Sequence, residues 1–240
     1  MALYHLIDKL VAAHPEVEIE SCSSGGGRID YEILKRTCRF WTSDCNDALE
    51  RQTIQKHMGI FFPPEVMGAH IGPYHSHTTR RTHDINLRGL TALSGHMGVE
   101  LDPVKESEQE KQAFAKYIAL HKRYRELLHS GEAFYLDSAD DTRLAYGMTK
   151  AQQTLITVCQ KAMPDYALPE PLILEHLDRA RDYKVTLVDY PQSSAQLMKP
   201  SDGWWEGEPL VVSGDWLATL GLSLPILDPE ACLLLSIEAV

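Results

Sequence analysis

The chain has 240 residues, 44% of them hydrophobic and 24% charged, so it can bury a sizeable core without disulfides or structural metals. Its formal net charge of −11 disfavours binding to nucleic acid, and no stretch approaches the ~20 apolar residues of a membrane-spanning helix. Scattered cysteines without a CxxC pair argue against a zinc ribbon or a secreted disulfide framework and favour a cytoplasmic setting: Cys22, Cys38, Cys45, Cys159 and Cys232.

The first part of the chain alternates helical and strand-like patterns. A helix comes first, because apolar residues recur at helical spacing from Leu3 to His14. Strand-like runs follow at 17–22, 39–43, 65–70 and 97–101, and helical patterns at 30–36, 47–58, 85–93 and 111–129. Strands that alternate with helices predict a parallel sheet, and four such units amount to half of a (β/α)₈ barrel of the TIM type.

The pattern changes after Gly131, which is placed to end the preceding helix. Short β-rich runs follow, separated by Pro, Gly and Asp, at 133–136, 143–146, 153–159, 184–189, 209–213 and 232–237. Such spacing is typical of an antiparallel sandwich. We therefore expect an α/β domain over residues 1–131 and a small all-β sandwich domain over residues 132–240.

A glycine run follows the first predicted strand, in the stretch ESCSSGGGRID at residues 20–30. Glycines allow a backbone to approach a ligand closely, because no Cβ intervenes. The Walker pattern and the GxGxxG dinucleotide fingerprint are both absent. On the pattern alone, a tight turn and a ligand-binding loop are equally plausible.

The second predicted strand ends in Trp41-Thr42-Ser43-Asp44. Asp44 comes just past the carboxyl end of the strand, where the active sites of βα barrels lie. Asp47 is well placed to cap the following helix. Trp41 offers a stacking surface for a sugar, although a single aromatic residue beside a strand is more often part of the core.

Four histidines follow the third predicted strand and raise the alternative of a zinc site: His70, His75, His77 and His83. Their spacing lacks HExxH, and no carboxylate or thiol ligand stands beside them. A polar loop is the preferred interpretation, and no metal is expected.

Taken together, the ordered blocks resemble the α-galactosidases of glycoside hydrolase family 36. The blocks are ESCSSGGGRID at 20–30, WTSD at 41–44, ER at 50–51, PEVMGAH at 64–70, TT at 78–79, Arg81 and GHMGVELD at 95–102. They place the chain in the second half of the catalytic barrel, with the C-terminal β domain after it. The resemblance implies retaining hydrolysis of terminal α-D-galactosides without a cofactor.

The resemblance also assigns roles to individual residues. Asp44 corresponds to the general acid/base, and Cys22 and Gly25 to residues that line the galactose pocket, with Trp41 beside them. A retaining glycosidase needs one carboxyl group to protonate the leaving oxygen and a second to attack the anomeric carbon. Because the first must hold its proton near neutral pH, we expect Asp44 in a partly desolvated pocket.

One part of the family pattern is missing from these residues. The family's nucleophile lies in a Lys-Trp-Asp block upstream of the helix with which the chain opens, and no Lys-Trp-Asp occurs in the sequence. The carboxylates of Glu18, Glu20, Glu100 and Asp102 do not belong at the nucleophile position. We therefore expect a chain that acts on α-galactoside oligosaccharides only with a complementing N-terminal segment, or as part of a homo-oligomer.

Two other interpretations remain open from the sequence. The chain could be a non-catalytic sugar-binding or assembly module that stacks sugars on Trp204, Trp205 or Trp216, although a role for these residues in the sandwich core is favoured. It could also be an inactive truncated reading frame, in which Met1 is a misplaced start.

Overall fold

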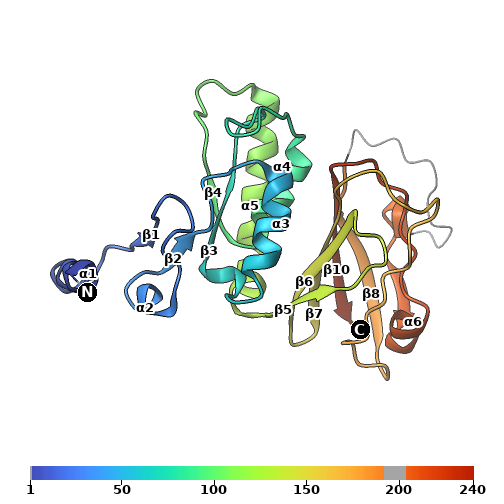
Figure 1. Cartoon of the computed structure of the whole chain (residues 1–240). Coiled ribbons are helices and arrows are strands. Elements are labelled where there is room, and N and C mark those ends of the chain that lie inside the picture. Colours follow the sequence, from blue (N-terminus) through green and yellow to red (C-terminus); the bar gives the residue numbers. More distant parts are fainter. Residues whose placement is uncertain (1, 192–203) are drawn as a thin grey trace. The chain divides into compact units, whose positions relative to one another are not determined.

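The computed structural model describes residues 2–191 and 204–240 (Figure 1). The chain forms two compact units, each with its own internal contacts. The first comprises residues up to His83 together with Thr91–Lys122, and the second comprises Asp84–Leu90 together with the residues from Arg123 onward. The helices α4 (Ile85–Leu93) and α5 (Glu108–Ser130) each contribute to both units.

The first unit contains a four-stranded parallel sheet in the order β1-β2-β3-β4. Its strands are β1 (Glu20–Ser21), β2 (Arg39–Trp41), β3 (Met67–Ile71) and β4 (His96–Val99). The predicted parallel arrangement is thus confirmed. The strands are shorter than the sequence runs predict, and β1 keeps only two residues of an alternating run of six.

The helix α1 (Ala2–Ala13) precedes β1. The helices α2 (Tyr31–Leu34) and α3 (Ala48–Met58) connect successive strands of the first unit, with the 3₁₀ turn η1 (Pro64–Val66) before β3. A small apolar cluster of Phe40, Phe62 and Met67 lies at its centre. α1 buries none of its residues and stands apart from the sheet in Figure 1.

The helix α3 packs through a polar face. Its buried residues are Ala48, Arg51, Gln52 and Gln55, which recur at helical spacing. The Gln52 side chain donates to the Thr91 hydroxyl (2.7 Å), and Gln55 donates to the Thr91 carbonyl (2.9 Å). The side-chain NH₂ groups of both glutamines thus donate to Thr91. This buried face of α3 is held by hydrogen bonds, whereas most helices pack through aliphatic side chains.

The second unit contains a six-stranded antiparallel sheet in the order β5-β6-β7-β10-β8-β9. Every β-rich run of the sequence corresponds to one of its strands. The strands are β5 (Glu132–Leu136), β6 (Arg143–Lys150), β7 (Gln153–Gln160), β8 (Asp182–Asp189), β9 (Leu210–Ser213) and β10 (Ala231–Ala239).

An apolar core covers one face of this sheet. It includes Trp204 and Trp205, which are 1% and 6% exposed, together with leucines from the extended segments around the Leu172–Leu222 bridge. The short elements η2 (Trp204–Glu206) and α6 (Gly214–Thr219) belong to this layer, and the sequence patterns did not predict α6. Trp204 and Trp205 are therefore core residues, which removes them as sugar-stacking surfaces.

Among the described residues, no helix has the length and hydropathy that a membrane crossing requires.

Candidate functional site

The segments that follow the four parallel strands meet at one edge of the sheet. The carboxyl ends of parallel strands share an edge, so the residues after β1, β2, β3 and β4 come together there. These residues include Gly25 after β1, Asp44 and Asn46 after β2, Gly72 after β3 and Glu100 after β4. The candidate site is built from their contacts.

The glycine run after β1 packs directly on the turn that carries Asp44. Gly25 has a φ of +69°, and a Cβ added there would lie 2.7 Å from the Asp44 backbone nitrogen and 2.9 Å from the Ser43 Cα. A Cβ on Gly26 would lie 2.6 Å from the Thr42 carbonyl oxygen. The glycines are therefore needed for contact with residues 42–44, an explanation that the sequence alone did not offer.

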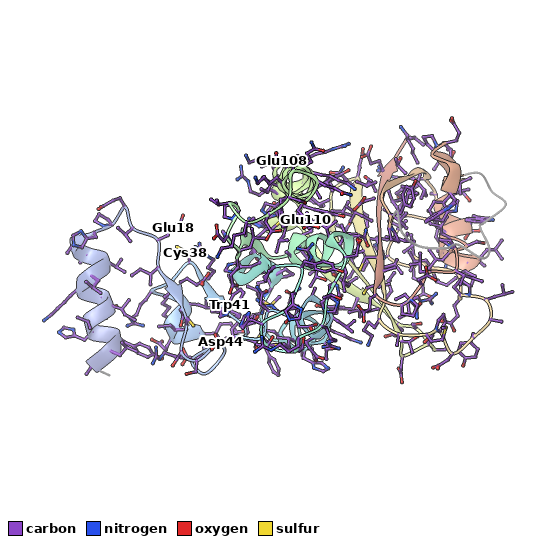
Figure 2. The ribbon with its side chains drawn as sticks, turned by 90° about the horizontal axis from the view of Figure 1, so that it is seen from above. Glu18, Cys38, Trp41, Asp44, Glu108 and Glu110 are labelled. Carbon is purple, nitrogen blue, oxygen red and sulfur yellow. The ribbon has the colours of Figure 1, made fainter. Side chains whose placement is uncertain are left out.

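Asp44 lies in the six-residue segment 42–47 between β2 and α3, and its side chain is exposed (Figure 2). We call this segment the acid/base turn, after the role that the resemblance implies for Asp44. The partly desolvated surroundings expected from the sequence are thus absent among the residues that the structure describes. The physical reason is that only the segments after β1 to β4 are available to enclose it. Cys22 is also exposed, whereas Gly25, another of the predicted pocket residues, packs directly on the Asp44 backbone.

Trp41, the last residue of β2, stacks with two side chains of the first unit. The Arg51 guanidinium lies 4.0 Å from the centre of the Trp41 ring, and the His70 ring stacks on Trp41 at 4.3 Å with an interplanar angle of 29°. Trp41 is only 8% exposed. Its ring is occupied by protein groups in this structure, and its role in binding a sugar stays a prediction.

Arg51 supports the acid/base turn from the sheet side. Its guanidinium donates to the Thr42 hydroxyl and to the Gly68 carbonyl (3.2 Å), and the side chain is buried. Burial lowers the pKa of Arg51 to about 10, against the opposing effect of Glu100 and Glu20. Sequence patterns alone do not mark Arg51 for a role in the site, because an arginine on a helix is usually expected to face solvent.

We expect Arg51→Lys to lower the free energy of unfolding by about 2 kcal/mol. A lysine cannot donate hydrogen bonds to both Thr42 and Gly68 while also stacking on Trp41. Urea denaturation of the chain measures the change, and Arg125→Lys, at an exposed position of α5, is the matched control. Equal stability of the two variants would contradict the supporting role of Arg51.

The four carboxylates considered as substitutes for a nucleophile all have partners. Glu100 Oε2 accepts from the Asn46 amide (3.0 Å) and lies 3.1 Å from His70 Nδ1. Glu18 and Glu20 both pair with Arg39, at 3.1 and 2.8 Å, and Asp102 pairs with Lys105 at 3.2 Å. Each of them therefore has a structural partner.

The histidines take separate positions. His70 stacks on Trp41, His83 Nε2 lies 3.0 Å from Asp47 Oδ1, and His75 forms an isolated bridge with Thr82. His77 is exposed. Among the described residues, no three histidine, cysteine, aspartate or glutamate side chains gather as a metal site would require.

Asp47 caps α3 as the sequence predicted. Its Oδ1 accepts from the backbone N–H groups of Leu49 (2.9 Å) and Glu50 (3.1 Å). Burial by itself would raise the pKa of this carboxyl, but hydrogen bonds from Thr79, His83 and the Glu50 amide outweigh it and hold the pKa well below its usual value. Asp47 is therefore a carboxylate at neutral pH, unsuited to hold the proton of a general acid.

This depressed pKa predicts how stability depends on pH. In the unfolded chain Asp47 titrates near ~3.9. As the pH falls, the unfolded chain takes up this proton before the folded chain does, so the contribution of Asp47 is complete above about pH 5 and is lost as the pH approaches the folded pKa. In urea denaturation from about pH 7 to about pH 3, the stability difference between the wild-type chain and Asp47→Asn should therefore shrink below about pH 5. A difference independent of pH would contradict this assignment.

Residues 1–131, more than half of the chain, match the sequence model of the family described as Melibiase. The chain belongs to the melibiase family. The members of this family are the α-galactosidases of glycoside hydrolase family 36, as the ordered blocks from residue 20 to residue 102 indicated.

The similarity to other melibiase family members extends over nearly the whole chain. The α-galactosidase of Escherichia coli is 47% identical over 242 residues, which cover 98% of this chain and 34% of that protein. The solved structure of a variant of the α-galactosidase AgaA from Geobacillus stearothermophilus with raffinose has a TM-score of 0.85 and 29% identity, and covers 99% of this chain and 31% of that one. Another AgaA variant, in complex with stachyose, gives a TM-score of 0.84 and 30% identity, with the same coverage.

The chain thus spans about a third of the length of the melibiase family members that it matches. The matched range, residues 1–131, includes both the glycine run and the acid/base turn. Four residues that contact this turn or belong to it were not predicted in that role from the sequence: Arg51, Asn46, Gly72 and His83. For Arg51 the sequence held one signal. The residue belongs to the ER block at 50–51 that resembles the family, at the helical spacing that places it on the buried face of α3.

Proposed function

We propose that the chain supplies the acid/base part of an α-galactosidase active site, with Asp44 as the general acid/base. One observation carries this proposal: the glycine backbone at Gly25 fixes the turn of an exposed carboxyl group at the carboxyl edge of a parallel sheet. This is the edge at which βα-barrel enzymes carry their catalytic groups. The family membership supplies the reaction, which is retaining hydrolysis of terminal α-D-galactosides.

In this reaction Asp44 acts twice. It first gives its proton to the glycosidic oxygen while the bond from C1 to that oxygen breaks and a carboxylate oxygen bonds to C1. It then takes a proton from water as the water oxygen replaces the carboxylate at C1. The attacking carboxylate is proposed to come from outside these 240 residues, because the family's Lys-Trp-Asp block does not occur in them. Glu18, Glu20, Glu100 and Asp102 are engaged in other contacts.

The proposed architecture is the second half of a (β/α)₈ barrel over residues 1–131 and a β sandwich over residues 132–240. The end of the family match at residue 131 supports the domain boundary. Within the described residues β1 and β4 pair on one side only, and α1 exposes Leu3, Leu6 and Leu10. A complementing N-terminal segment or a second copy would cover these edges and desolvate Asp44.

The proposed substrates are α-galactoside oligosaccharides, and raffinose and stachyose are the natural first choices because AgaA variants were solved with them. Cys22, Gly25 and Trp41 are the proposed pocket residues. The setting is proposed to be cytoplasmic. The scattered cysteines, with no CxxC pair among them, support this proposal.

A chimera tests the proposal. Residues 1–240 replace the matching third of the Escherichia coli α-galactosidase, and the chimera and the isolated chain are assayed with an activated aryl α-galactoside and with raffinose. We expect the chimera to hydrolyse both substrates and the isolated chain to fall far below it. A folded chimera without activity would reject the role of Asp44, and an isolated chain as fast as the Escherichia coli enzyme would reject the need for a complementing segment.

A further inference from the structure

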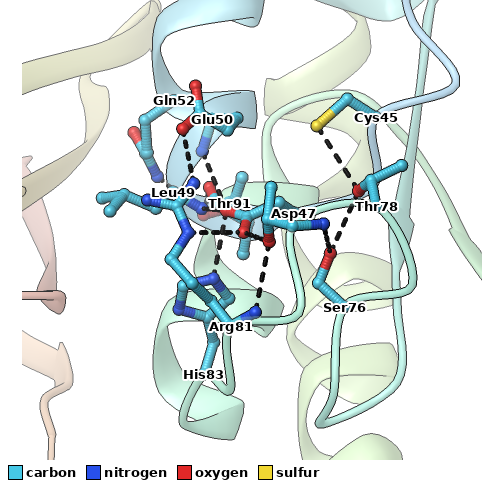
Figure 3. A network of polar contacts seen from close by, with 12 residues as sticks. Cys45, Asp47, Leu49, Glu50, Gln52, Ser76, Thr78, Arg81, His83 and Thr91 are labelled. Atoms are coloured by element: carbon cyan, nitrogen blue, oxygen red, sulfur yellow. Dashed lines mark hydrogen bonds and ion pairs between the residues drawn. The ribbon is translucent and has the colours of Figure 1, made fainter.

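Asp47, three residues after Asp44, accepts hydrogen bonds on both of its carboxylate oxygens (Figure 3). Oδ1 caps α3 through the Leu49 and Glu50 amides and also lies 3.0 Å from His83 Nε2. Oδ2 accepts from Arg81 Nε (2.9 Å) and from the Thr79 hydroxyl. A helix cap needs only one of these oxygens, so the second has a different purpose.

Oδ2 joins two segments that are distant in the sequence. Asp47 ends the acid/base turn, whereas Thr79, Arg81 and His83 belong to the segment that follows β3. We call Asp47 and these three residues the Asp47 clamp. Asp47 is 0% exposed, so its contacts with the clamp are shielded from water and strengthened by the low local dielectric.

Other contacts between the same two segments run beside the clamp. The Cys45 sulfur lies 3.6 Å from the Thr78 hydroxyl, and a Cβ on Gly72 would lie 2.7 Å from the Asn46 side-chain nitrogen. The acid/base turn is therefore backed along Cys45, Asn46 and Asp47 by the segment after β3.

The turn is fixed at three points. Arg51 holds Thr42 at its start, Gly25 packs on Ser43 and Asp44 in its middle, and the Asp47 clamp holds its end. Only six residues lie between β2 and α3. With so few residues fixed at both ends, the exposed Asp44 side chain projects from a backbone that has little freedom left.

We propose that Asp47 is a positioning residue for the acid/base, and that the Asp47 clamp sets where Asp44 meets the leaving oxygen. The inference rests on the proposed role of Asp44. Arg81 also bonds Glu50 on α3, so the clamp ties the segment after β3 to the first turn of the helix at two points. The depressed pKa of Asp47 keeps it ionised at neutral pH, as an acceptor of several donors requires.

Asp47→Asn separates the clamp from the cap. Asparagine caps helices as well as aspartate, so its side-chain oxygen can replace Oδ1. Its NH₂ group then faces the donors of Arg81 and Thr79, where it cannot accept a hydrogen bond. In the chimera we expect kcat/KM for raffinose to fall about 10- to 100-fold, because small misplacements of a catalytic group have effects of this size.

The dependence on the leaving group distinguishes positioning from a structural effect. An activated aryl galactoside needs little protonation in the first step, so its kcat/KM, which reports that step, should change by less than about threefold in Asp47→Asn. A loss of folded protein would lower both rates by the same factor. An equal loss for raffinose and for the aryl substrate would overturn the proposal.

Asp140→Asn is the matched control. Asp140 is also a buried carboxylate that accepts from a backbone amide and a threonine hydroxyl, those of Thr142, and it lies in the second unit. We expect no selective loss with raffinose in this variant. If Asp44→Asn itself shows no such selectivity, the proposed function fails. If Asp44→Asn shows it and Asp47→Asn does not, only the clamp proposal fails.

Hydrogen exchange tests the same proposal on the chain without any activity. The Cys45 amide donates to the Ser43 hydroxyl (3.1 Å) inside the turn. In Asp47→Asn the amides of Ser43, Asp44 and Cys45 should exchange at least about tenfold faster, with no change in β5 to β10, because local opening of the turn becomes easier. Unchanged exchange in the turn would overturn the proposal.

Discussion

Asp44→Asn in the chimera should lower kcat/KM for raffinose by about 10²- to 10⁴-fold, the contribution typical of a general acid. The sugar that leaves from raffinose is a poor leaving group, so the bond to C1 cannot break readily without a proton from Asp44. Asparagine has nearly the same shape and cannot supply that proton. An activated aryl galactoside should retain a much larger fraction of its rate in the first step.

The second step gives an independent readout. Without Asp44 no general base activates water, so the galactosyl-enzyme should accumulate and produce a burst of aryl product. Azide, which attacks without losing a proton, should restore turnover of the aryl substrate. A variant that shows neither a burst nor restoration by azide would contradict the assignment of Asp44.

Asp102→Asn is the control for this experiment. Asp102 is also an exposed aspartate at the end of a strand, and it pairs with Lys105. We expect its kcat/KM to stay within about threefold of the unsubstituted chimera, the range of a surface change away from the reacting atoms. A large loss in Asp102→Asn would mean that the segment after β4 takes part in the reaction.

The positions of the strands along the chain and the place of Asp44 after the second strand could be predicted because both follow from the sequence pattern. Runs of alternating or apolar residues marked the strands, and Asp44 came directly after one of them. The strand lengths were less predictable. β1 is an edge strand that pairs with β2 only, so most residues of the run at 17–22 have no strand to pair with. α6 was missed because a six-residue helix that begins with Gly214 shows no clear periodicity.

The supports of the site could not be predicted because they join residues far apart in the sequence. Gly25 and Asp44 are packed together across one βα unit, and Asp47 meets Arg81 across another. The buried face of α3 was also hidden, because Arg51, Gln52 and Gln55 are residues that hydrophobic patterning assigns to solvent. What makes this face stable is a set of specific polar partners, which only the folded arrangement reveals.

Gly25→Ala should show how strongly the site depends on such packing. The residue has a φ of +69°, where a side chain costs about 1–3 kcal/mol, and its Cβ would lie 2.7 Å from the Asp44 nitrogen. Because the opposing atoms are backbone, the acid/base turn must move as a whole. We expect the variant chimera to lose about 100-fold in kcat for raffinose, beyond any loss of stability.

Gly207→Ala separates the effect of backbone strain from the effect of displacing the acid/base turn. Gly207 also has a positive φ, +95°, but a Cβ there meets no atom of the described residues within 4 Å. It should lower the free energy of unfolding, measured by urea denaturation, through backbone strain alone and leave kcat unchanged. If Gly25→Ala behaved like Gly207→Ala, the turn would tolerate the added methyl group. The close approach of the glycine backbone would then have no part in holding Asp44. If the losses differ as expected, the glycine run acts through the protein's own turn, and its contact with Asp44 is the reason that this position cannot carry a side chain.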